Sequence, residues 1–119
     1  YHAEAFPNPT QEISFTASAS GVAQATGIEF LCDNKESVII EYTLSTSSAS
    51  RRGTLTMLLD NASGVPTTSS IKDEFDISTG AIPVEFSLTD NSTDKFILNF
   101  KTTDIVNAHT FTYVQKSFK

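Results

Sequence analysis

Three carboxylates fall close together in the segment KDEFD, where Asp73, Glu74 and Asp76 lie within four residues. Two carboxyl groups can act as general acid and general base when both face the same substrate. Neighbouring side chains of an extended strand point to opposite faces, however, so adjacency in the chain does not bring them together. The segment therefore favours a charged strand over a catalytic acid–base pair.

The other residue types that could do chemistry are few and isolated. His2 and His109 are the two histidines, and neither has a cysteine or an acid at the spacing of a zinc site. Cys32 has no basic neighbour in sequence, which predicts a small buried apolar residue and not a nucleophile. No G-x-S-x-G motif is present to activate a serine. We expect a protein that is not an enzyme and that uses no cofactor and no metal.

Acids and amides gather where the chain is expected to turn. Calcium prefers such oxygen ligands, but the D-x-[DN]-x-[DN]-G pattern is absent, and Asp and Asn are common turn residues. If the domain binds a ligand, we expect the loops at 61–70, 90–94 and 104–109 to do so, because loops can vary on a rigid scaffold. The residues expected to bind are Asn61, Asn91, Asp94, Asn107 and His109.

Length and charge narrow the class of protein. The 119 residues suit one domain, and a single cysteine cannot form an internal disulfide. Fourteen acidic residues against eight basic ones give a net charge of −6, which repels phosphate backbones and anionic lipids. We therefore expect neither nucleic-acid binding nor membrane insertion.

Apolar and polar residues alternate along almost the whole chain, with turn residues between the runs. This period of two predicts β-strands, and short polar connections predict that neighbouring strands are antiparallel. The expected fold is all-β, an antiparallel β-sandwich or jelly roll of about eight strands. The predicted strands cover 11–17, 26–32, 37–44, 53–60, 70–77, 82–88, 95–101 and 110–118.

The first ten residues, YHAEAFPNPT, differ from the rest, because Pro7 and Pro9 lack the N–H groups that a sheet needs and no apolar face alternates. We expect residues 1–10 to form an extended arm or linker, and residues 11–119 to form a single β-sandwich domain.

Two adjacent arginines, Arg51 and Arg52, lie at the junction of the two most regular strands. A guanidinium offers a rigid fork of donors that suits a carboxylate. The acidic segment supplies the expected partners, Asp73, Glu74 or Asp76, within one subunit or across an interface. The alternative is two solvated loop arginines, each contributing about 0 to 1 kcal/mol.

The order of segments from residue 11 onward resembles a β-rich module at the C-terminal ends of tailed-bacteriophage fibre proteins and related virion proteins. The matching features are a strand with a tyrosine, a basic residue before Gly-Thr-Leu, an acidic stretch and a final aromatic strand. The residues at these places are Tyr42, Arg52, Gly53, Thr54, Leu55, Asp73, Glu74, Phe86 and Phe118. The resemblance implies no catalytic residues and a homotrimer around a fibre axis.

The expected function is accordingly a structural or host-recognition domain of a virion appendage. Its partners would be its own copies, through an interface containing Arg51, Arg52, Asp73 and Glu74, and a host cell-surface glycan or protein. Two alternatives stay open: a monomeric, lectin-like jelly roll that binds carbohydrate, and a surface adhesin or pilin domain stabilised by donated strands. The absence of Trp argues against an aromatic sugar platform.

Overall fold

The computed structural model describes residues 9–32, 34–61, 68–90 and 95–118. Eight strands form two antiparallel sheets, which confirms the predicted β-sandwich. The strands are β1 (Gln11–Phe15), β2 (Gln24–Leu31), β3 (Lys35–Ser45), β4 (Ser50–Asp60), β5 (Thr68–Thr79), β6 (Val84–Asp90), β7 (Lys95–Thr102) and β8 (His109–Phe118). Among the described residues, helices with the length and apolarity to span a membrane are absent.

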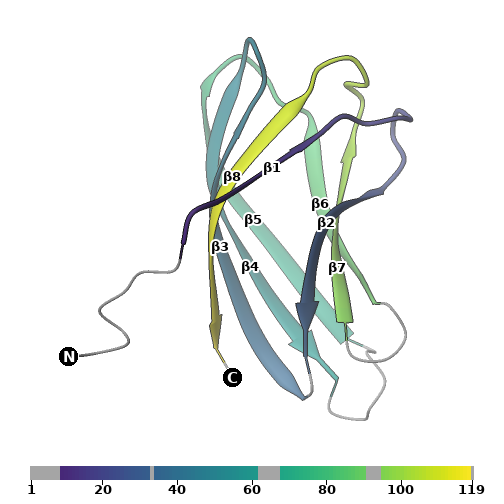
Figure 1. The fold of residues 1–119 in the computed structure, drawn as a ribbon, viewed down its shortest axis with the longest axis vertical. Coiled ribbons are helices and arrows are strands. Elements are labelled where there is room, and N and C mark those ends of the chain that lie inside the picture. The colour runs from purple at the N-terminus through teal and green to yellow at the C-terminus, as the bar shows by residue number, and fades with distance from the viewer. Residues whose placement is uncertain (1–8, 33, 62–67, 91–94, 119) are drawn as a thin grey trace, which may run out of the picture.

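The two sheets differ in size. The larger has the order β1-β8-β3-β4-β5 and the smaller the order β2-β7-β6 (Figure 1). The chain changes sheet after β1, β2, β5 and β7, so each sheet is built from segments distant in sequence. This exchange lets the alternating apolar residues of both sheets face a shared interior.

The central hairpin of β3 and β4 pairs over its whole length, from Lys35 opposite Asp60 to Ser45 opposite Ser50. The predicted inward residues are buried, for example Ile40 and Leu44 on β3 and Leu55 on β4, each with 0% of its surface exposed. Strand β4 starts three residues earlier than predicted. The arginine pair is therefore part of a strand, and the expectation of a loop junction is wrong.

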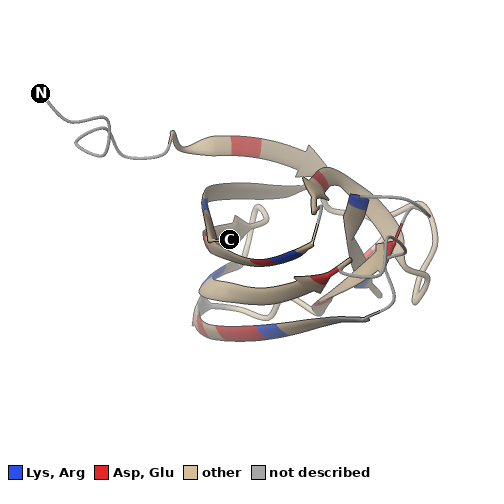
Figure 2. Ribbon diagram, turned by 90° about the horizontal axis from the view of Figure 1, so that it is seen from below, with Lys and Arg blue, Asp and Glu red and all other residues tan. Residues whose placement is uncertain are grey.

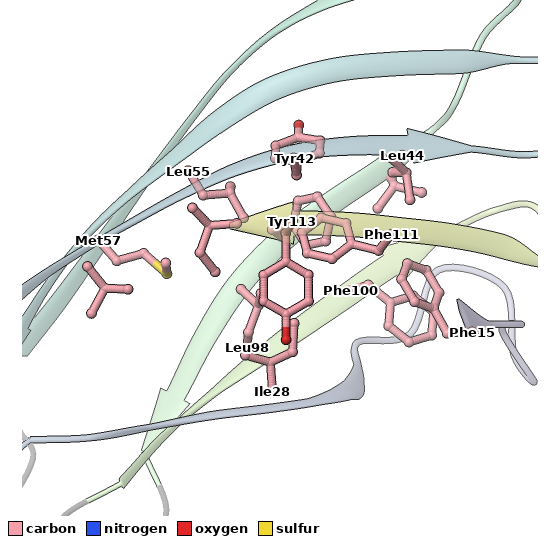
Figure 3. Close-up of a cluster of buried hydrophobic side chains, with 14 of the residues drawn as sticks. Phe15, Ile28, Tyr42, Leu44, Leu55, Met57, Leu98, Phe100, Phe111 and Tyr113 are labelled. Atoms are coloured by element: carbon pink, nitrogen blue, oxygen red, sulfur yellow. The ribbon is translucent and has the colours of Figure 1, made fainter. Parts of the chain in front are cut away.

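The core joins the sheets through aromatic and aliphatic side chains (Figure 3). Phe111 of β8 is fully buried, and its ring centroid lies 5.1 Å from that of Tyr42 and 5.4 Å from that of Phe86. Phe15 stacks on Phe100 with centroids 4.1 Å apart. Contacts between offset or edge-on rings add to the free energy gained from apolar burial. Cys32 is buried as predicted, with 1% of its surface exposed.

Strand β5 departs from the simple sandwich pattern. Phe75 and Ile77 follow the inward phase that was predicted for them, yet they are 44% and 49% exposed. The reason is that β5 is the edge of a five-stranded sheet that faces a sheet of three strands. The smaller sheet leaves the inner face of β5 incompletely covered.

The predicted arm falls mostly outside the described residues, which begin at Pro9. Pro9 and Thr10 are exposed and precede the first strand.

Replacing Phe111 with alanine is expected to lower the free energy of unfolding by about 3 to 5 kcal/mol, because it leaves a cavity among three aromatic rings. Phe118 on the same strand is 53% exposed, so Phe118→Ala is the matched control and should change the free energy by no more than about 0.5 kcal/mol. Urea denaturation of both variants measures the difference. Equal losses would contradict the described core.

Candidate functional site

Arg51 is the largest fully buried side chain in the described part of the protein, with 1% of its surface exposed. Its Nη2 donates to Asp73 Oδ2 at 3.0 Å, and its Nε donates to the Tyr42 hydroxyl at 3.2 Å. Its Nη1 donates to the backbone oxygens of Ile82 at 3.1 Å and Val84 at 3.0 Å. The guanidinium thus links β4 and β5 of the larger sheet to the start of β6 in the smaller one.

Tyr42 and Asp73 complete this buried network. The Tyr42 hydroxyl donates to Asp73 Oδ1 at 2.7 Å, so both carboxylate oxygens accept a hydrogen bond. Burial raises the pKa of the Tyr42 phenol and keeps it protonated as a donor. Burial also raises the pKa of Asp73, whereas the hydrogen bond from Tyr42 and the positive charge of Arg51 act in the opposite direction.

Phe75 covers the guanidinium of Arg51. The Arg51 Cζ lies 3.9 Å from the Phe75 ring centroid, close enough for a cation–π contact. Phe86 lies on β6 with its ring centroid 5.7 Å from the same atom. The charge is therefore held by one carboxylate, two carbonyls, a phenol and aromatic faces, which is the compensation that a buried charge requires.

Gly53 gives Tyr42 its path to Asp73. Tyr42 on β3 pairs with Gly53 on β4, and Gly53 pairs with Phe75 on β5. A Cβ atom on Gly53 would lie 2.5 Å from the backbone oxygen of Glu74, 2.7 Å from the Phe75 Cβ and 2.9 Å from the Tyr42 hydroxyl. Without that atom, the phenol reaches across β4 to the neighbouring strand.

The expected contact between the arginine pair and the acidic segment is confirmed for one arginine. Arg51 forms an ion pair with Asp73, which is 18% exposed. Arg52 points to the other face of β4, where it is exposed and forms no ion pair with any described residue. The side chains of the acidic segment alternate between the two faces of β5, as in any strand. Asp73 faces inward, whereas Glu74 is exposed on the outer face, where its carboxylate lies 3.7 Å from the Lys72 ammonium.

The outer face of the larger sheet holds an open groove of about 760 Å³. Its floor consists of two cross-strand rows. In the first, the paired residues run Thr112, Thr43, Arg52 and Asp76. In the second, they run Val114, Glu41, Thr54 and Glu74. Basic and acidic residues are distributed over several strands (Figure 2).

Of the five residues expected to bind a ligand, the structure describes Asn61, Asn107 and His109, and it does not bring these three together. Asn61 follows the end of β4 that pairs with Lys35, whereas His109 begins β8, which pairs with the Ser45 end of β3. Ten residues of strand separate these ends, a distance of about 33 Å. Figure 1 shows the end of β4 and the start of β8 at opposite ends of the sandwich. Asn91 and Asp94 lie outside the described residues.

Asn61 and His109 are buried, which corrects the expectation that both would be exposed loop residues. Asn61 is 4% exposed, and its Nδ2 donates to the backbone oxygen of Cys32 at 2.8 Å. His109 is fully buried and stacks on Phe15, with ring centroids 5.4 Å apart. Both side chains join segments inside the sandwich, so neither presents a group to a ligand.

Asn107 is half-buried in a turn, where its backbone N–H and its side-chain amide both donate to Asp104. Asp104 Oδ1 accepts hydrogen bonds from the backbone N–H groups of Val106 and Asn107, both at 3.0 Å, and Oδ2 accepts one from Asn107 Nδ2 at 2.9 Å. These bonds, first the one from the Asn107 side chain, lower the pKa of Asp104 to about 2. No group of three or more His, Cys, Asp or Glu residues that could hold a metal occurs among the described residues.

Comparisons with known proteins give one weak structural likeness. No protein-family model matches the chain. No curated protein matches it either. Among solved structures, the tailspike protein of Acinetobacter baumannii phage AM24 aligns with 92% of this chain at 8% sequence identity and a TM-score of 0.41. The aligned part is 26% of the tailspike, so the chain spans about a quarter of that protein's length. A TM-score of this size carries no argument about function.

Arg51→Ala is expected to lower the free energy of unfolding by about 3 to 5 kcal/mol, because it leaves the Asp73 carboxylate partly buried without its cation. Arg52→Ala is the matched control. It removes the same side chain from the exposed face and should cost no more than about 1 kcal/mol. Denaturant unfolding of the two single variants gives the comparison. Similar losses at both positions would contradict the assignment of Arg51 to the interior.

Asn107→Ala is expected to raise the pKa of Asp104 from about 2 toward its ordinary value, since the strongest contributing hydrogen bond is lost. The pKa of Asp104 is lower in the folded state than in the unfolded state. Its carboxylate therefore makes its full contribution to the free energy of unfolding at pH values above the unfolded-state pKa. This contribution is lost as the pH falls through the folded value of about 2. Carboxyl-carbon NMR titration measures the shift. Val106→Ala keeps the backbone N–H that donates to Asp104 and serves as the control. An equal pKa of Asp104 in both variants would contradict the hydrogen bond from the Asn107 side chain.

Proposed function

We propose that this chain is a non-enzymatic structural and host-recognition domain of a phage tail fibre or a similar virion appendage, and that it assembles as a homotrimer. The ordered sequence features that resemble the fibre module support the first part. The observation that carries the assembly is the incompletely covered inner face of β5.

This face combines exposed apolar side chains with free strand edges. Phe75 and Ile77 are about half exposed on the side of β5 that faces the smaller sheet. Each of β5 and β6 pairs on one side only in the described part of the chain. Between them lies a groove of about 350 Å³, lined by residues that include Ile71, Val84 and Phe86. An uncovered strand edge beside apolar side chains is a surface suited to another polypeptide.

The proposed occupant is a second copy of this chain. Interfaces between identical subunits are more apolar at their centre than ordinary protein surface, as Phe75 and Ile77 are here. In a closed trimer each copy would offer its groove to one neighbour and a different surface to the other, so the groove would be covered three times. Arg51 and Asp73 lie directly beneath Phe75 and would hold it in place for that contact.

A monomeric carbohydrate-binding module is the second candidate. It is favoured by the polar groove on the outer face of the larger sheet, which needs no second copy. This groove shares Phe75 with the groove between β5 and β6, here called the β5 edge groove. An adhesin or pilin domain would instead fill the β5 edge groove with a strand donated by a different protein.

The 119-residue chain is expected to have three times its monomer mass of 12.9 kDa in light scattering on a sizing column. Ile77→Ser should raise the concentration at which the trimer dissociates by about tenfold or more, because it removes apolar area at the interface. Leu58→Ser is the matched control, since Leu58 is 55% exposed but points away from the β5 edge groove. A monomer at a concentration of about 100 µM would contradict the assembly and favour the second candidate.

A further inference from the structure

The outer-face groove presents hydrogen-bonding groups of both kinds from strands and not from loops. Arg52 lies at its centre, between Thr43 on β3 and Asp76 on β5 in one cross-strand row. Thr54 follows Arg52 by two residues on the same face of β4 and pairs with Glu41. All these residues belong to paired strands, so their spacing is fixed before any ligand arrives.

In the part of the chain that the structure describes, no residue forms an ion pair with Arg52, so its donors are available to a ligand. Arg52 forms no ion pair with Asp76, although the two residues are direct cross-strand neighbours. The other carboxylates of the groove have partners of their own, because Glu41 pairs with Lys116 at 3.7 Å and Glu74 pairs with Lys72 at 3.7 Å. The exposed guanidinium of Arg52, with its planar set of N–H donors, therefore lies beside the exposed carboxylate of Asp76, which can accept hydrogen bonds.

The charges in the groove select the class of ligand. An anionic ligand would meet the carboxylates of Glu41, Glu74 and Asp76, and a cationic one would meet Arg52. A sugar hydroxyl both donates and accepts, so it can bind a carboxylate and a guanidinium together. Threonine hydroxyls also do both, and their methyl groups can contact the C–H groups of a sugar ring. The volume of about 760 Å³ lies within the range of small-ligand sites.

We infer that the outer-face groove, with Arg52 at its centre and Thr43, Thr54 and Asp76 beside it, binds a neutral oligosaccharide segment of a host surface glycan. This inference rests on the host-recognition part of the proposed function and moves recognition from the loops to the sheet. The groove is shallow and polar, so a single site binds weakly. Three copies on one fibre axis raise the effective affinity by factors on the order of 100 to 10,000 when the target is dense.

The test uses the 119-residue chain. It is applied to a panel of immobilised neutral oligosaccharides, about two to six sugars long, and to the same panel with a uronic acid added. Wild-type protein should bind members of the neutral panel. Arg52→Ala and Thr43→Val should each weaken that binding by roughly tenfold or more, the loss that accompanies removal of one hydrogen-bonding group to a charged or buried partner. Thr56→Val is the matched control, because Thr56 is exposed on the same face of β4 outside the groove.

Two further measurements keep the outcomes separate. Thermal unfolding must be the same for all variants, which shows that a loss of binding is not a loss of fold. Asn107→Ala tests the loop at 104–109 and should bind like wild type. No binding to the neutral panel, a preference for the uronic-acid panel, or full binding by Arg52→Ala would each overturn the inference. Light scattering on the same samples tests assembly independently. A trimer that binds no sugar would therefore refute sugar binding in the outer-face groove and leave the proposed assembly intact.

Discussion

A positive charge that lies between two sheets must be compensated by groups that the sheets themselves supply. In this protein the charge is the guanidinium of Arg51, and the compensating groups come from β3, β5 and the start of β6. The carbonyls of Ile82 and Val84 are directed at it from the opposite sheet. The two bonds from Arg51 to these carbonyls fix the position of one sheet relative to the other, because hydrogen bonds weaken steeply as their distance and angle depart from ideal values. An apolar core alone tolerates small shifts that this network does not.

The same network supports the edge strand β5, which the smaller sheet leaves partly uncovered. Asp73 is satisfied by Arg51 and Tyr42, whereas the apolar residues Phe75 and Ile77 of the same face stay about half exposed. Phe75 lies over the guanidinium with one side of its ring and is 44% exposed. The apolar wall of the groove beside β5 therefore has a hydrogen-bonded support behind it.

The strands and most of the core could be predicted from sequence, because Val38, Ile40, Tyr42 and Leu44 alternate with polar residues and are all buried. The early start of β4 was missed because Ser50, Arg51 and Arg52 look like a polar turn. A signal was present, since Arg51 and Gly53 share the phase of Leu55 and Asp73 shares the phase of Ile71. Asn61 and His109 could not be placed, because their burial depends on Cys32 and Phe15, which are distant in the chain. The outer-face groove depends on the register of four strands, β8, β3, β4 and β5, which alternation alone does not fix.

Gly53 also has a bearing on errors of strand pairing. A slip of one residue between β3 and β4 turns every β4 side chain to the opposite face. After such a slip the second arginine of the pair would occupy the interior, so Asp73 would still meet a guanidinium and the charge could not distinguish the two registers. Tyr42 would then face Arg52 or Thr54 where it now faces Gly53, and a side chain would block its path to β5. The missing Cβ thus adds a steric penalty against the shifted hairpin to the apolar burial that already fixes this register.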